Sequence, residues 1–523
     1  MNHLSEQEII RRDKLKELEK LGIEPYPAAE YPVTHHAQEI KRIWKETPNQ
    51  LIHPSTNQPI DICLAGRIMS IRDMGKAAFA VLQDDSGKIQ LYIRKDDVTN
   101  GDDTTKYDIV WKKLMDIGDI IGVKGFVFTT KTGETSVHVK EFTLLSKSVR
   151  PLPVVKEKDG HTFDEVTDAE FRYRQRYADL IVNPHVKEIF IRRTKMINAI
   201  RSFLNERGAI EVDTPVLQSI PGGAAARPFI THHNALDVPF YLRIANELYL
   251  KRLIVGGFDW VYEFSRNFRN EGMDRTHNPE FTVLEFYVAY KDYLWMMETT
   301  EQLLESTAIA VNGTTKAQFG ENEIDFKAPY KRISMYDAIK EHTGIGISNM
   351  DEQGLREVCS RLGIHADKTM GKGKLIDEIF SEKCEHYFVQ PTFIIDYPVE
   401  MSPLTKKHRS KPGLVERFEL IVHGKEIANA YSELNDPLEQ RERFEEQAKL
   451  MERGDDEAMY IDQDFLRALE YGMPPASGIG FGIDRLCMLL TNQPSIQDVL
   501  FFPQMRPEKW EEDENKQEDE SKG

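Results

Sequence analysis

The sequence predicts an α+β chain in which a small antiparallel β-barrel precedes a larger domain of alternating helices and strands. Three observations support this prediction. A length of 523 residues exceeds what one hydrophobic core usually organises, so two or three domains are expected. Residues 60–150 carry short strand patterns separated by turn signals. Beyond residue 168, helical and strand patterns alternate as far as about residue 503.

The composition indicates a globular chain that stays in the cytoplasm and crosses no membrane. Hydrophobic residues make up 40% of the chain and charged residues 29%, which argues against wholesale disorder. No run approaches the roughly 18 apolar residues of a membrane span, and the first residues are too charged for a secretory signal peptide. The cysteines lie far apart without metal-ligand spacing, so we expect reduced, mostly buried thiols.

The net charge of −18 would repel a polyanion at long range, but the charge is unevenly distributed. Residues 61–150 carry 14 basic and 13 acidic side chains, so a nucleic-acid-binding surface on the barrel is compatible with the composition. Residues 508–523 carry 3 basic and 8 acidic side chains, which indicates an acidic, solvated and disordered tail.

Residues 1–59 are predicted to form a helical extension. Ser5 and Glu8 make a capping-box pattern ahead of strong helix formers, so a charged helix is expected over residues 5–21. Its basic side chains could contact a phosphate backbone, although a solvated face is the simpler interpretation. Three prolines between residues 22 and 32 then stop the helix.

The strand patterns of residues 60–150 predict about five antiparallel strands, with hairpin turns at 85–87 and 131–133. An OB-type barrel is the candidate that fits a nucleic-acid surface, although other small barrels share this pattern. Residues 151–168 are predicted to be a linker and residues 169–507 the larger domain. In that domain we predict a helix at 195–208, a strand at 209–217 and helices through 298–380.

A charged hairpin is predicted at residues 261–290, with Arg269 and Glu271 at the entrance of its polar loop. Strand alternation places Glu285 on one face with Phe281 and Tyr287. A carboxylate among apolar neighbours needs a cationic partner, because an unpaired buried charge is costly. From this pattern alone, an ion pair between Glu285 and an internal Arg or Lys is the simpler interpretation.

A second hairpin is predicted at residues 415–433, with Glu419 and Glu426 flanking its turn. Two glutamates on neighbouring strands suit Mg²⁺, which accepts carboxylates together with substrate phosphates. Strict pairing puts Glu426 on the wrong face for a shared site, so a β-bulge or a distortion driven by the metal is needed if both glutamates serve one site. Further along the strand, alternation places Asn429, Tyr431 and Glu433 on one face. A surface hairpin of solvated charges is the alternative, which the interleaved aliphatic residues weaken.

The third landmark is a GxGxG run, Gly478, Gly480 and Gly482, which leads into an apolar helix that carries Arg485 in its first turn. Glycines at this spacing allow close backbone approach to a bulky ligand, and Arg485 would supply charge or a flat stacking surface. Taken alone, a tightly packed joint between a strand and a helix explains the run equally well.

Together these segments resemble the three signature motifs of class II aminoacyl-tRNA synthetases. The runs FRNEGMDRTHNPEFT, ANAYSELNDP and GIGFGIDRL are similar to the aspartate, asparagine and lysine subgroup almost residue for residue, and most similar to its lysine enzymes. LYLKRLIVGGF and PGGAAARPFITHHNALD extend the resemblance over residues 5–505. The class I signatures HIGH and KMSKS are absent. The resemblance implies a ligase that activates L-lysine with ATP and transfers it to tRNA(Lys).

The resemblance also implies a mainly antiparallel catalytic sheet, a homodimer interface around residues 187–217 and a set of site residues. Arg269 and Arg485 would be catalytic, and Phe281 and Arg485 would sandwich the adenine. The full implied set is Arg269, Glu271, His277, Phe281 and Arg485 for ATP, Glu419 and Glu426 for Mg²⁺, and Glu247, Glu285, Tyr287, Asn429, Tyr431 and Glu433 for lysine.

The pocket charges favour lysine over the acidic or amide substrates of the same subgroup. An ammonium needs carboxylates, which Glu285 and Glu433 supply, whereas an acidic substrate would need cations. Two other functions fit the sequence less well. An RNA-binding protein without the chemistry is disfavoured by the intact charges at Arg269, Glu271, Glu419, Glu426 and Arg485. A ligase that modifies proteins is disfavoured by the barrel, which such relatives lack.

In the barrel, Phe79 and Gln90 lie on adjacent strand patterns and Arg67 on the one before. An aromatic ring with polar neighbours is how OB barrels stack and read single-stranded bases. The resemblance implies that Arg67, Phe79, Gln90 and Glu134 read a uridine-rich anticodon. The alternative is that Phe79 belongs to the barrel core.

Overall fold

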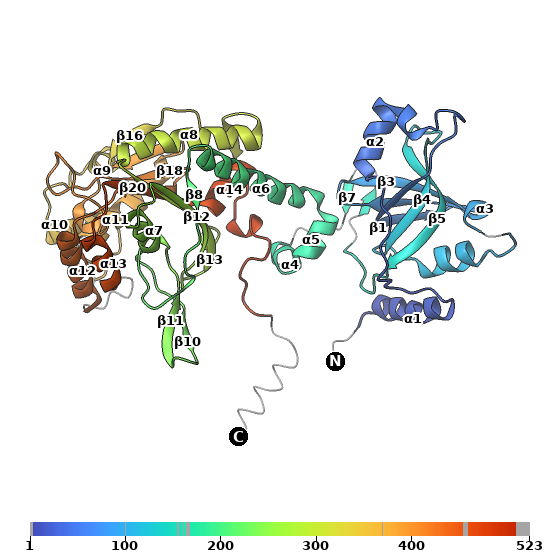
Figure 1. Cartoon of the computed structure of the whole chain (residues 1–523), viewed down its shortest axis with the longest axis horizontal. Helices are drawn as coiled ribbons and strands as arrows, with labels where there is room; N and C mark the ends of the chain where they lie inside the picture. Colours follow the sequence, from blue (N-terminus) through green and yellow to red (C-terminus); the bar gives the residue numbers. More distant parts are fainter. Residues whose placement is uncertain are drawn as a thin grey trace, which may run out of the picture. The chain divides into compact units, whose positions relative to one another are not determined.

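The computed structural model describes residues 4–99, 101–153, 156–158, 161–163, 168–368, 370–452 and 459–508. It divides into two compact units, Met1–Val166 and Thr167–Pro507, which are described separately (Figure 1). The predicted acidic tail lies outside the described residues except for its first residue, and so does part of the predicted linker. The described part of that linker contains a two-stranded sheet of β6 (Lys156–Lys158) and β7 (His161–Phe163).

The first unit is a closed five-stranded barrel, as predicted, but its strands are not all antiparallel, because the third and the fifth pair in parallel. Its strands are β1 (Ile62–Asp73), β2 (Ala77–Gln83), β3 (Lys88–Arg94), β4 (Ile120–Thr129) and β5 (Thr135–Ser146), in the order β1-β2-β3-β5-β4. Both predicted hairpin turns join strands as expected. Short helical segments complete the unit: α2 (Ala37–Glu46), η1 (Pro48–Leu51), α3 (Lys95–Val98) and the π-helix η2 (Lys106–Leu114).

Helix α1 (Glu6–Lys20) begins where the sequence predicts, and Ser5 and Glu8 form the expected capping box. The prediction that the basic side chains of this helix lie on a solvated face is only partly correct. Leu18 packs into the barrel core, and buried Arg11 donates a hydrogen bond to the carbonyl oxygen of Ser148 at 3.0 Å. The helix is therefore anchored to the barrel by both apolar and polar contacts.

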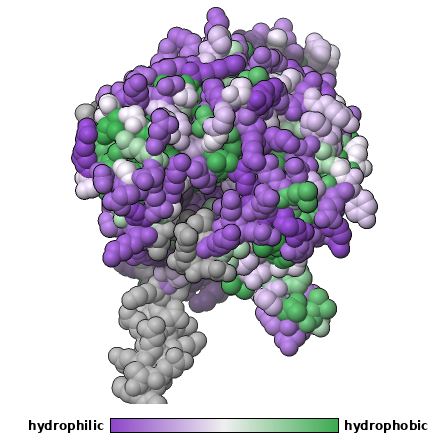
Figure 2. Space-filling model, turned by 90° about the vertical axis from the view of Figure 1, so that its left-hand side faces the viewer, coloured by the Kyte–Doolittle hydropathy of each residue, from purple (hydrophilic) through white to green (hydrophobic). Residues whose placement is uncertain are grey.

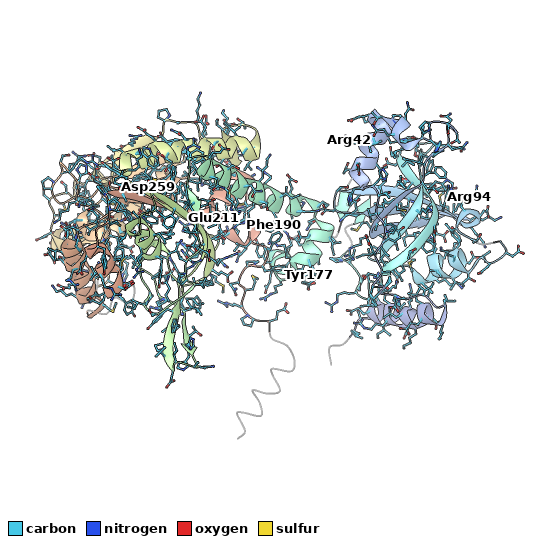
Figure 3. All side chains as sticks on the ribbon, in the orientation of Figure 1. Arg42, Arg94, Tyr177, Phe190, Glu211 and Asp259 are labelled. Atoms are coloured by element: carbon cyan, nitrogen blue, oxygen red, sulfur yellow. The ribbon has the colours of Figure 1, made fainter. Side chains whose placement is uncertain are left out.

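The second unit is built on an eight-stranded, mainly antiparallel sheet. Its strand order is β16-β17-β18-β19-β20-β13-β12-β8, and only the β16–β17 and β8–β12 pairs are parallel. The strands are β8 (Ile210–Glu211), β12 (Trp260–Phe268), β13 (Glu280–Ala289), β16 (Lys331–Ser334), β17 (Thr392–Ile395), β18 (Arg417–Val422), β19 (Lys425–Ser432) and β20 (Ala476–Gly482). Figure 3 labels Glu211 on the edge strand β8. This topology places β20 between β13 and β19, the strands of the two predicted hairpins.

Helices cover both faces of this sheet. One face packs against α6 (Pro184–Asn205), α8 (Tyr293–Asn312) and α14 (Ile483–Thr491), which share a core with Leu284 and Phe286 of β13. On the other face, α7 (Glu247–Val255) and α13 (Gln463–Glu470) share a core with Tyr287. Consecutive residues of β13 thus face different layers, and Glu285 and Tyr287 face the layer of α7 and α13.

The remaining elements lie around this framework. They are α4 (Ala169–Arg174), α5 (Arg176–Val182), β9 (Leu217–Gln218), β10 (Ile230–His233), β11 (Val238–Leu242), β14 (Lys316–Phe319), β15 (Asn322–Asp325), α9 (Met335–Thr343), α10 (Glu352–Leu362), α11 (Lys372–Lys383), η3 (Glu385–Tyr387), η4 (Val399–Met401), α12 (Pro437–Glu452) and η5 (Ile496–Asp498). The β10–β11 hairpin projects from the unit (Figure 1). Helices α9, α10 and α11 share a core of their own with β17.

Three local predictions need correction. The helix predicted at 195–208 begins much earlier, because Pro184 occupies its first turn, where a missing N–H costs nothing. The strand predicted at 209–217 is only the two short pieces β8 and β9. Between them Thr214 donates to the Glu263 carboxylate at 2.7 Å, and Pro215 lacks a ladder donor. The stretch 298–380 also contains the β14–β15 hairpin, which turns at Gly320.

Two composition-based expectations can be compared with the structure. All four cysteines are free thiols, and Cys359, Cys384 and Cys487 are buried as expected, whereas Cys63 is half-buried. Among the helices of the described residues, none is both long and apolar enough to span a bilayer.

Candidate active site

Three neighbouring strands form the floor of the candidate active site, and the glycines of the middle strand make room for it. Pairing places Glu285 of β13 and Asn429 of β19 on either side of Gly480, and Tyr287 and Tyr431 on either side of Gly478. Side chains from both outer strands therefore lie over a central strand that has none on this face. The GxGxG run makes room for the walls of a pocket, not only for a ligand.

Gly478 is the position where this arrangement is tightest. A Cβ atom there would lie 2.2 Å from Cε1 of Tyr287 and 2.3 Å from Oε1 of Glu433. Gly478→Ala is expected to lower stability by about 1–3 kcal/mol through overpacking and to raise the KM for the pocket's substrate. Thermal unfolding and steady-state kinetics would measure both effects. Gly346→Ala is the matched control, because nothing lies within 4 Å of a Cβ there. A parent-like melting temperature and KM for Gly478→Ala would contradict the geometry.

Glu285 is a buried carboxyl group that has no ion-pair partner among the described residues. It is 7% exposed, and the Tyr287 hydroxyl donates to its Oε2 at 3.0 Å. Burial, aided by the negative charge of Glu247, raises the pKa of Glu285 to about 8. The internal cation that the sequence pattern suggested for Glu285 is therefore not among its contacts, and a bound cation would complete the site.

Two further glutamates close the pocket, and both contact a lysine that the sequence analysis missed. Lys251 of α7 is fully buried and forms ion pairs with Glu247, one helical turn earlier, and with Glu433, just after β19. The Tyr431 hydroxyl also donates to Glu247 at 2.6 Å. The i,i+4 spacing of Glu247 and Lys251 was the available sequence signal. All six predicted lysine-binding residues are thus on the strands, helix and loop around one pocket.

The nucleotide side of the site is built around two arginines. The guanidinium of Arg269 lies over the Phe281 ring, 5.0 Å from its centroid, and its buried Nε has no hydrogen-bond partner among the described residues. Burial lowers the pKa of Arg269, and no carboxylate of the described residues forms an ion pair with it. A cation without a counter-ion next to an aromatic ring suits a ligand that carries both an anionic group and a planar base.

Arg485, in the first turn of α14, joins the two hairpins. It donates to the carbonyl oxygen of Glu426 at 2.8 Å and to Nε2 of His277 at 3.2 Å. His277 in turn contacts the Asp274 carboxylate at 2.8 Å. The loop between β12 and β13, which carries exposed Glu271, is therefore tied to β19. These contacts bring Arg485 and His277 together, whereas Glu271 has no ion pair with either.

The β18–β19 hairpin contains a β-bulge, which was one of the two alternatives that the sequence left open. Glu419 pairs with Asn429 and Leu420 with Ala428, but the next pair is Ile421 with Glu426, so Ile427 is the extra residue. This register shift places Glu426 on the face of Glu419. Burial, together with the charge of Glu426, raises the pKa of Glu419 to about 8.

These two carboxylates fit a hard divalent cation. Mg²⁺ bound with a nucleotide takes carboxylate oxygens, and these two groups supply them on one face. Glu419 also has an ion pair with Arg417. Among the described residues no group of three or more His, Cys, Asp or Glu side chains is arranged as a metal cage. Arg417, a residue the sequence analysis missed, positions the hairpin by donating to Glu419 at 2.5 Å and to Asn429 at 3.0 Å.

The barrel presents a second candidate surface, on its outer face. Ala78, Ala80 and Leu82 point into the barrel core, so the half-buried Phe79 points outward, with its ring 5.0 Å from that of Tyr92. Register places Arg67 opposite Gln83, next to this face.

The predicted polar residues of the barrel lie around Phe79 in different ways. Gln90 pairs with Val81 on the same outer face. Arg67 donates to the carbonyl oxygen of Gly118 at 2.7 Å. Glu134 stands apart in the β4–β5 turn, where Lys41 lies 3.4 Å from its carboxylate.

More aromatic rings extend this face than the sequence analysis identified. Tyr92 packs edge-on against His138, with centroids 5.2 Å apart, and His138 stacks on Phe126 at 4.8 Å. Alternation within β3, β4 and β5 was the available signal. Stacked rings on the outside of an OB-type barrel are suited to unpaired nucleobases.

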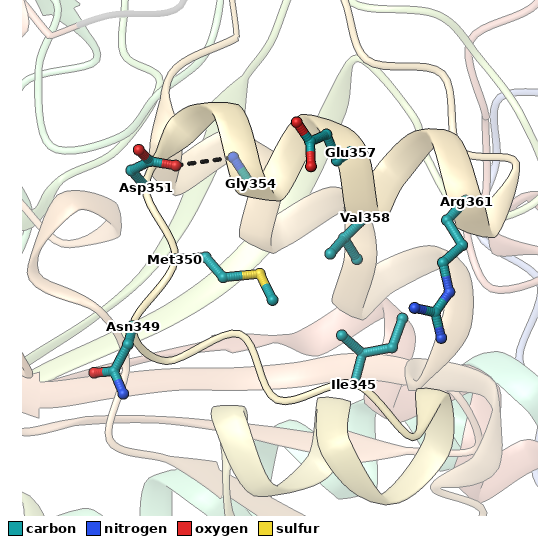
Figure 4. Close-up of a pocket in the computed structure, with 8 residues that line it drawn as sticks. All are labelled: Ile345, Asn349, Met350, Asp351, Gly354, Glu357, Val358 and Arg361. Carbon is teal, nitrogen blue, oxygen red and sulfur yellow. Dashed lines mark hydrogen bonds between the residues drawn. The ribbon is translucent and has the colours of Figure 1, made fainter.

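One pocket of the second unit lies away from all these residues. It is formed by α10 and the segment before it (Figure 4). Ile345, Met350 and Val358 supply its apolar lining, and Asp351 caps α10 by accepting from the Gly354 N–H at 2.9 Å. Of the charged side chains that line this pocket, Asp351 serves as the helix cap and Glu357 and Arg361 lie on the exposed side of α10.

Comparison with known proteins identifies the family. The model for class II tRNA synthetases of the D, K and N type matches residues 168–506. The chain belongs to this family. The model for the OB-fold nucleic acid binding domain, described as tRNA anti-codon, matches residues 62–145, which are the strands of the barrel. Both halves of the fold predicted from the sequence are therefore confirmed.

Close relatives of this class II synthetase are named lysine–tRNA ligase. One from Porphyromonas gingivalis is 68% identical over 97% of this chain and 86% of its own length. One from Christiangramia forsetii is 66% identical over 97% of this chain and 88% of its own. One from Azobacteroides pseudotrichonymphae is 64% identical, with 97% and 99% covered. The synthetase therefore aligns with these relatives over nearly its whole length.

Proposed function

We propose that this synthetase is a lysine–tRNA ligase, which activates L-lysine with ATP to lysyl-adenylate and transfers lysine to the 3′ end of tRNA(Lys). The observation that carries the proposal is Glu285. Its carboxyl group is buried and has no ion-pair partner among the described residues, and it lies in a pocket with Glu247 and Glu433. The ammonium of a lysine side chain supplies the missing charge.

In this reaction the lysine carboxylate attacks the α-phosphorus of ATP, pyrophosphate leaves, and a ribose hydroxyl of the tRNA then takes the lysyl group from AMP. No protein nucleophile is required. Arg269 neutralises charge on the phosphate and orients the lysine carboxylate, and Phe281 and Arg485 hold the adenine between them. Rate enhancement comes from in-line positioning and electrostatic stabilisation. Glu271 and His277 contact ATP, and Asn429 orients the lysine carboxylate.

Glu419 and Glu426 would hold Mg²⁺. When bound, the ion neutralises phosphate oxygens and favours departure of pyrophosphate. The shared face created by the Ile427 bulge supports this assignment.

The barrel is proposed to read the anticodon of tRNA(Lys) through Arg67, Phe79, Gln90 and Glu134. Phe79→Ala should raise the KM for tRNA about 5- to 100-fold, because stacking of one base on an aromatic ring is worth about 1–3 kcal/mol. Lysine-dependent ATP–pyrophosphate exchange by the same variant is the internal control, because it does not involve the barrel. An unchanged KM for tRNA would remove Phe79 from the anticodon site.

The synthetase is also proposed to act as a homodimer in the cytoplasm. Apolar side chains are exposed around the predicted interface and on the projecting β10–β11 hairpin: Ile191, Ile210, Leu217, Ile230 and Leu236. Figure 2 shows hydrophobic (green) side chains on the part that projects at the lower right. Exposed apolar surface of this kind is typical of a subunit interface. Four free thiols suit a reducing compartment.

Lysine binding should depend on pH through Glu285. Its pKa of about 8 in the free protein means that the carboxyl group is protonated near neutrality, whereas an ammonium binds the carboxylate. The affinity for lysine should therefore rise from pH 6 to pH 8. Because the folded pKa lies above the unfolded one, the same group makes folding less favourable as pH rises over this window. Calorimetric titration with lysine at several pH values would measure the effect, and a flat profile would contradict it.

The proposed function is tested by pyrophosphate exchange with each of the twenty amino acids, followed by charging of total tRNA with the best one. Lysine is the expected substrate, and tRNA(Lys) the expected acceptor. Preferred exchange with aspartate or asparagine would overturn the assignment.

A further inference from the structure

Lys251 is a fully buried cation that contacts two carboxylates of the proposed lysine pocket directly. Its Nζ forms ion pairs with Glu247 and Glu433, and lies 5.3 Å from the centroid of the Tyr431 ring. The rings of Tyr287 and Phe465 are each 6.0 Å away. Aromatic faces and two carboxylates thus enclose an ammonium group, which is the environment that a lysine substrate itself would need.

The charges of this pocket do not cancel in the free protein. Three carboxyl groups, Glu247, Glu285 and Glu433, share one fixed ammonium. If all are ionised, two negative charges remain. L-lysine carries two ammonium groups, and its carboxylate is assigned to Arg269 and Asn429. With Lys251 in place, the two remaining negative charges therefore match the two ammonium groups of the substrate.

We propose that Lys251 is a positioning residue that holds the side chains of Glu247 and Glu433 in place through its two ion pairs and so sets the charge and geometry with which the pocket selects lysine. The inference rests on the proposed function. It deepens that function by assigning a specificity role to a residue that does not need to contact the substrate.

The other charged groups near Lys251 have partners of their own. On β12, Glu263 pairs with Arg243 at 2.7 Å. On α7, Arg252 pairs with Asp462 at 2.7 Å and with Asp464 at 3.3 Å. The groups that face Lys251 without another cation are therefore Glu247, Glu433 and Glu285, together with the hydroxyls of Tyr287 and Tyr431.

The charge of Lys251 lowers the pKa of two of these glutamates, Glu433 and Glu285, against the larger effect of burial. Burial raises the pKa of Glu433 to about 8, and the charge of Lys251 opposes that rise. Lys251 acts in the same direction on Glu285. Without it, more of the pocket would be protonated at neutral pH, and a protonated carboxyl group binds an ammonium poorly.

The test is Lys251→Met, assayed by lysine-dependent pyrophosphate exchange from pH 7 to pH 9. We expect the KM for lysine to rise about tenfold or more at pH 7, since each unit of pKa changes the ionised fraction about tenfold. The effect on kcat should be smaller. The ratio of variant to parent KM should fall as pH rises, because alkaline solution restores the carboxylates. A ratio that is constant with pH, or a parent-like KM, would overturn the proposal.

Further variants separate this role from a structural one. Lys147→Met is the matched control, because Lys147 is also a fully buried lysine between two carboxylates, Asp116 at 2.6 Å and Asp119 at 2.7 Å, but lies in the barrel. It should lower the melting temperature and leave the pH profile of lysine KM unchanged. Lys251→Arg should keep a parent-like profile. If Lys251→Met does not fold, Lys251→Gln replaces it, because glutamine retains a polar partner for the carboxylates. Its KM for lysine must then be raised most at pH 7 and less as pH rises. A rise in KM that is constant with pH would overturn the proposal.

Failure of the inference differs from failure of the proposed function. A parent protein that exchanges pyrophosphate with lysine, beside a Lys251→Met variant with the parent pH profile, contradicts the inference alone. A folded parent protein without lysine-dependent exchange contradicts both.

Discussion

Replacing Arg269 by alanine is expected to slow lysine-dependent ATP–pyrophosphate exchange about 10²- to 10³-fold, which is the usual cost of removing one preorganised charge from a transition state. Arg269 has no ion-pair partner among the described residues, and its guanidinium lies over Phe281. Its charge is therefore available for the phosphate. Because the α-phosphate gains charge as the lysine carboxylate attacks, kcat should fall more than the KM for lysine rises.

Arg266→Ala is the matched control for this experiment. Arg266 lies on β12, three residues before Arg269, is exposed, and pairs with Glu280 at 3.3 Å. Its loss should leave exchange within about twofold of the parent, as expected for an exposed ion pair worth little. If Arg269→Ala exchanges pyrophosphate at a rate close to that of Arg266→Ala, then Arg269 does not stabilise the reacting phosphate.

Replacing Glu285 by glutamine is expected to reduce kcat/KM for lysine by roughly 30- to 4,000-fold, which corresponds to about 2–5 kcal/mol for one partner of a desolvated charge pair. Glutamine keeps the size of the side chain and a hydrogen bond with Tyr287 but removes the charge. The loss should therefore appear in lysine kinetics and not in the KM for ATP. Stability near pH 8 should rise, because no carboxylate is left to be buried without a partner.

Glu280→Gln tests whether the effect is specific to the pocket. Glu280 lies on the same strand at its half-exposed end, so its neutralisation should change kcat/KM for lysine by less than about threefold. Equal losses in the two variants would show that the negative charge acts over the whole sheet and not through contact with the substrate.

Repeated local patterns were sufficient to predict most of this fold. Turn residues flanked by alternating strands located the barrel hairpins and both hairpins of the catalytic sheet, and the structure confirms them. The bulge at Ile427 was also predictable, because two functional glutamates on one face are incompatible with unbroken alternation. The start of α6 was missed because its apolar periodicity is weaker before Met196. Pro184 occupies the first turn of this helix, although a proline more often indicates that a helix has ended.

The candidate site could be predicted only where side chains act on a substrate, and not where they act on one another. Glu285 and Glu433 stand out in sequence as carboxylates among apolar residues. Lys251 does not, because a lysine on a helix is usually solvated, and its burial follows from how α7 packs over β13. Arg417 was missed because its contacts with Glu419 and Asn429 depend on the register of the two strands, which the sequence does not specify.

The extra residue at Ile427 divides the β18–β19 hairpin into two segments with separate registers. The segment next to the turn carries Glu426, and the segment beyond the bulge carries Asn429 and Tyr431. Changes in one segment need not rotate the side chains of the other. A change at the turn can therefore shift Glu426 while Glu419, Asn429 and Tyr431, which all belong to the segment beyond the bulge, keep their places.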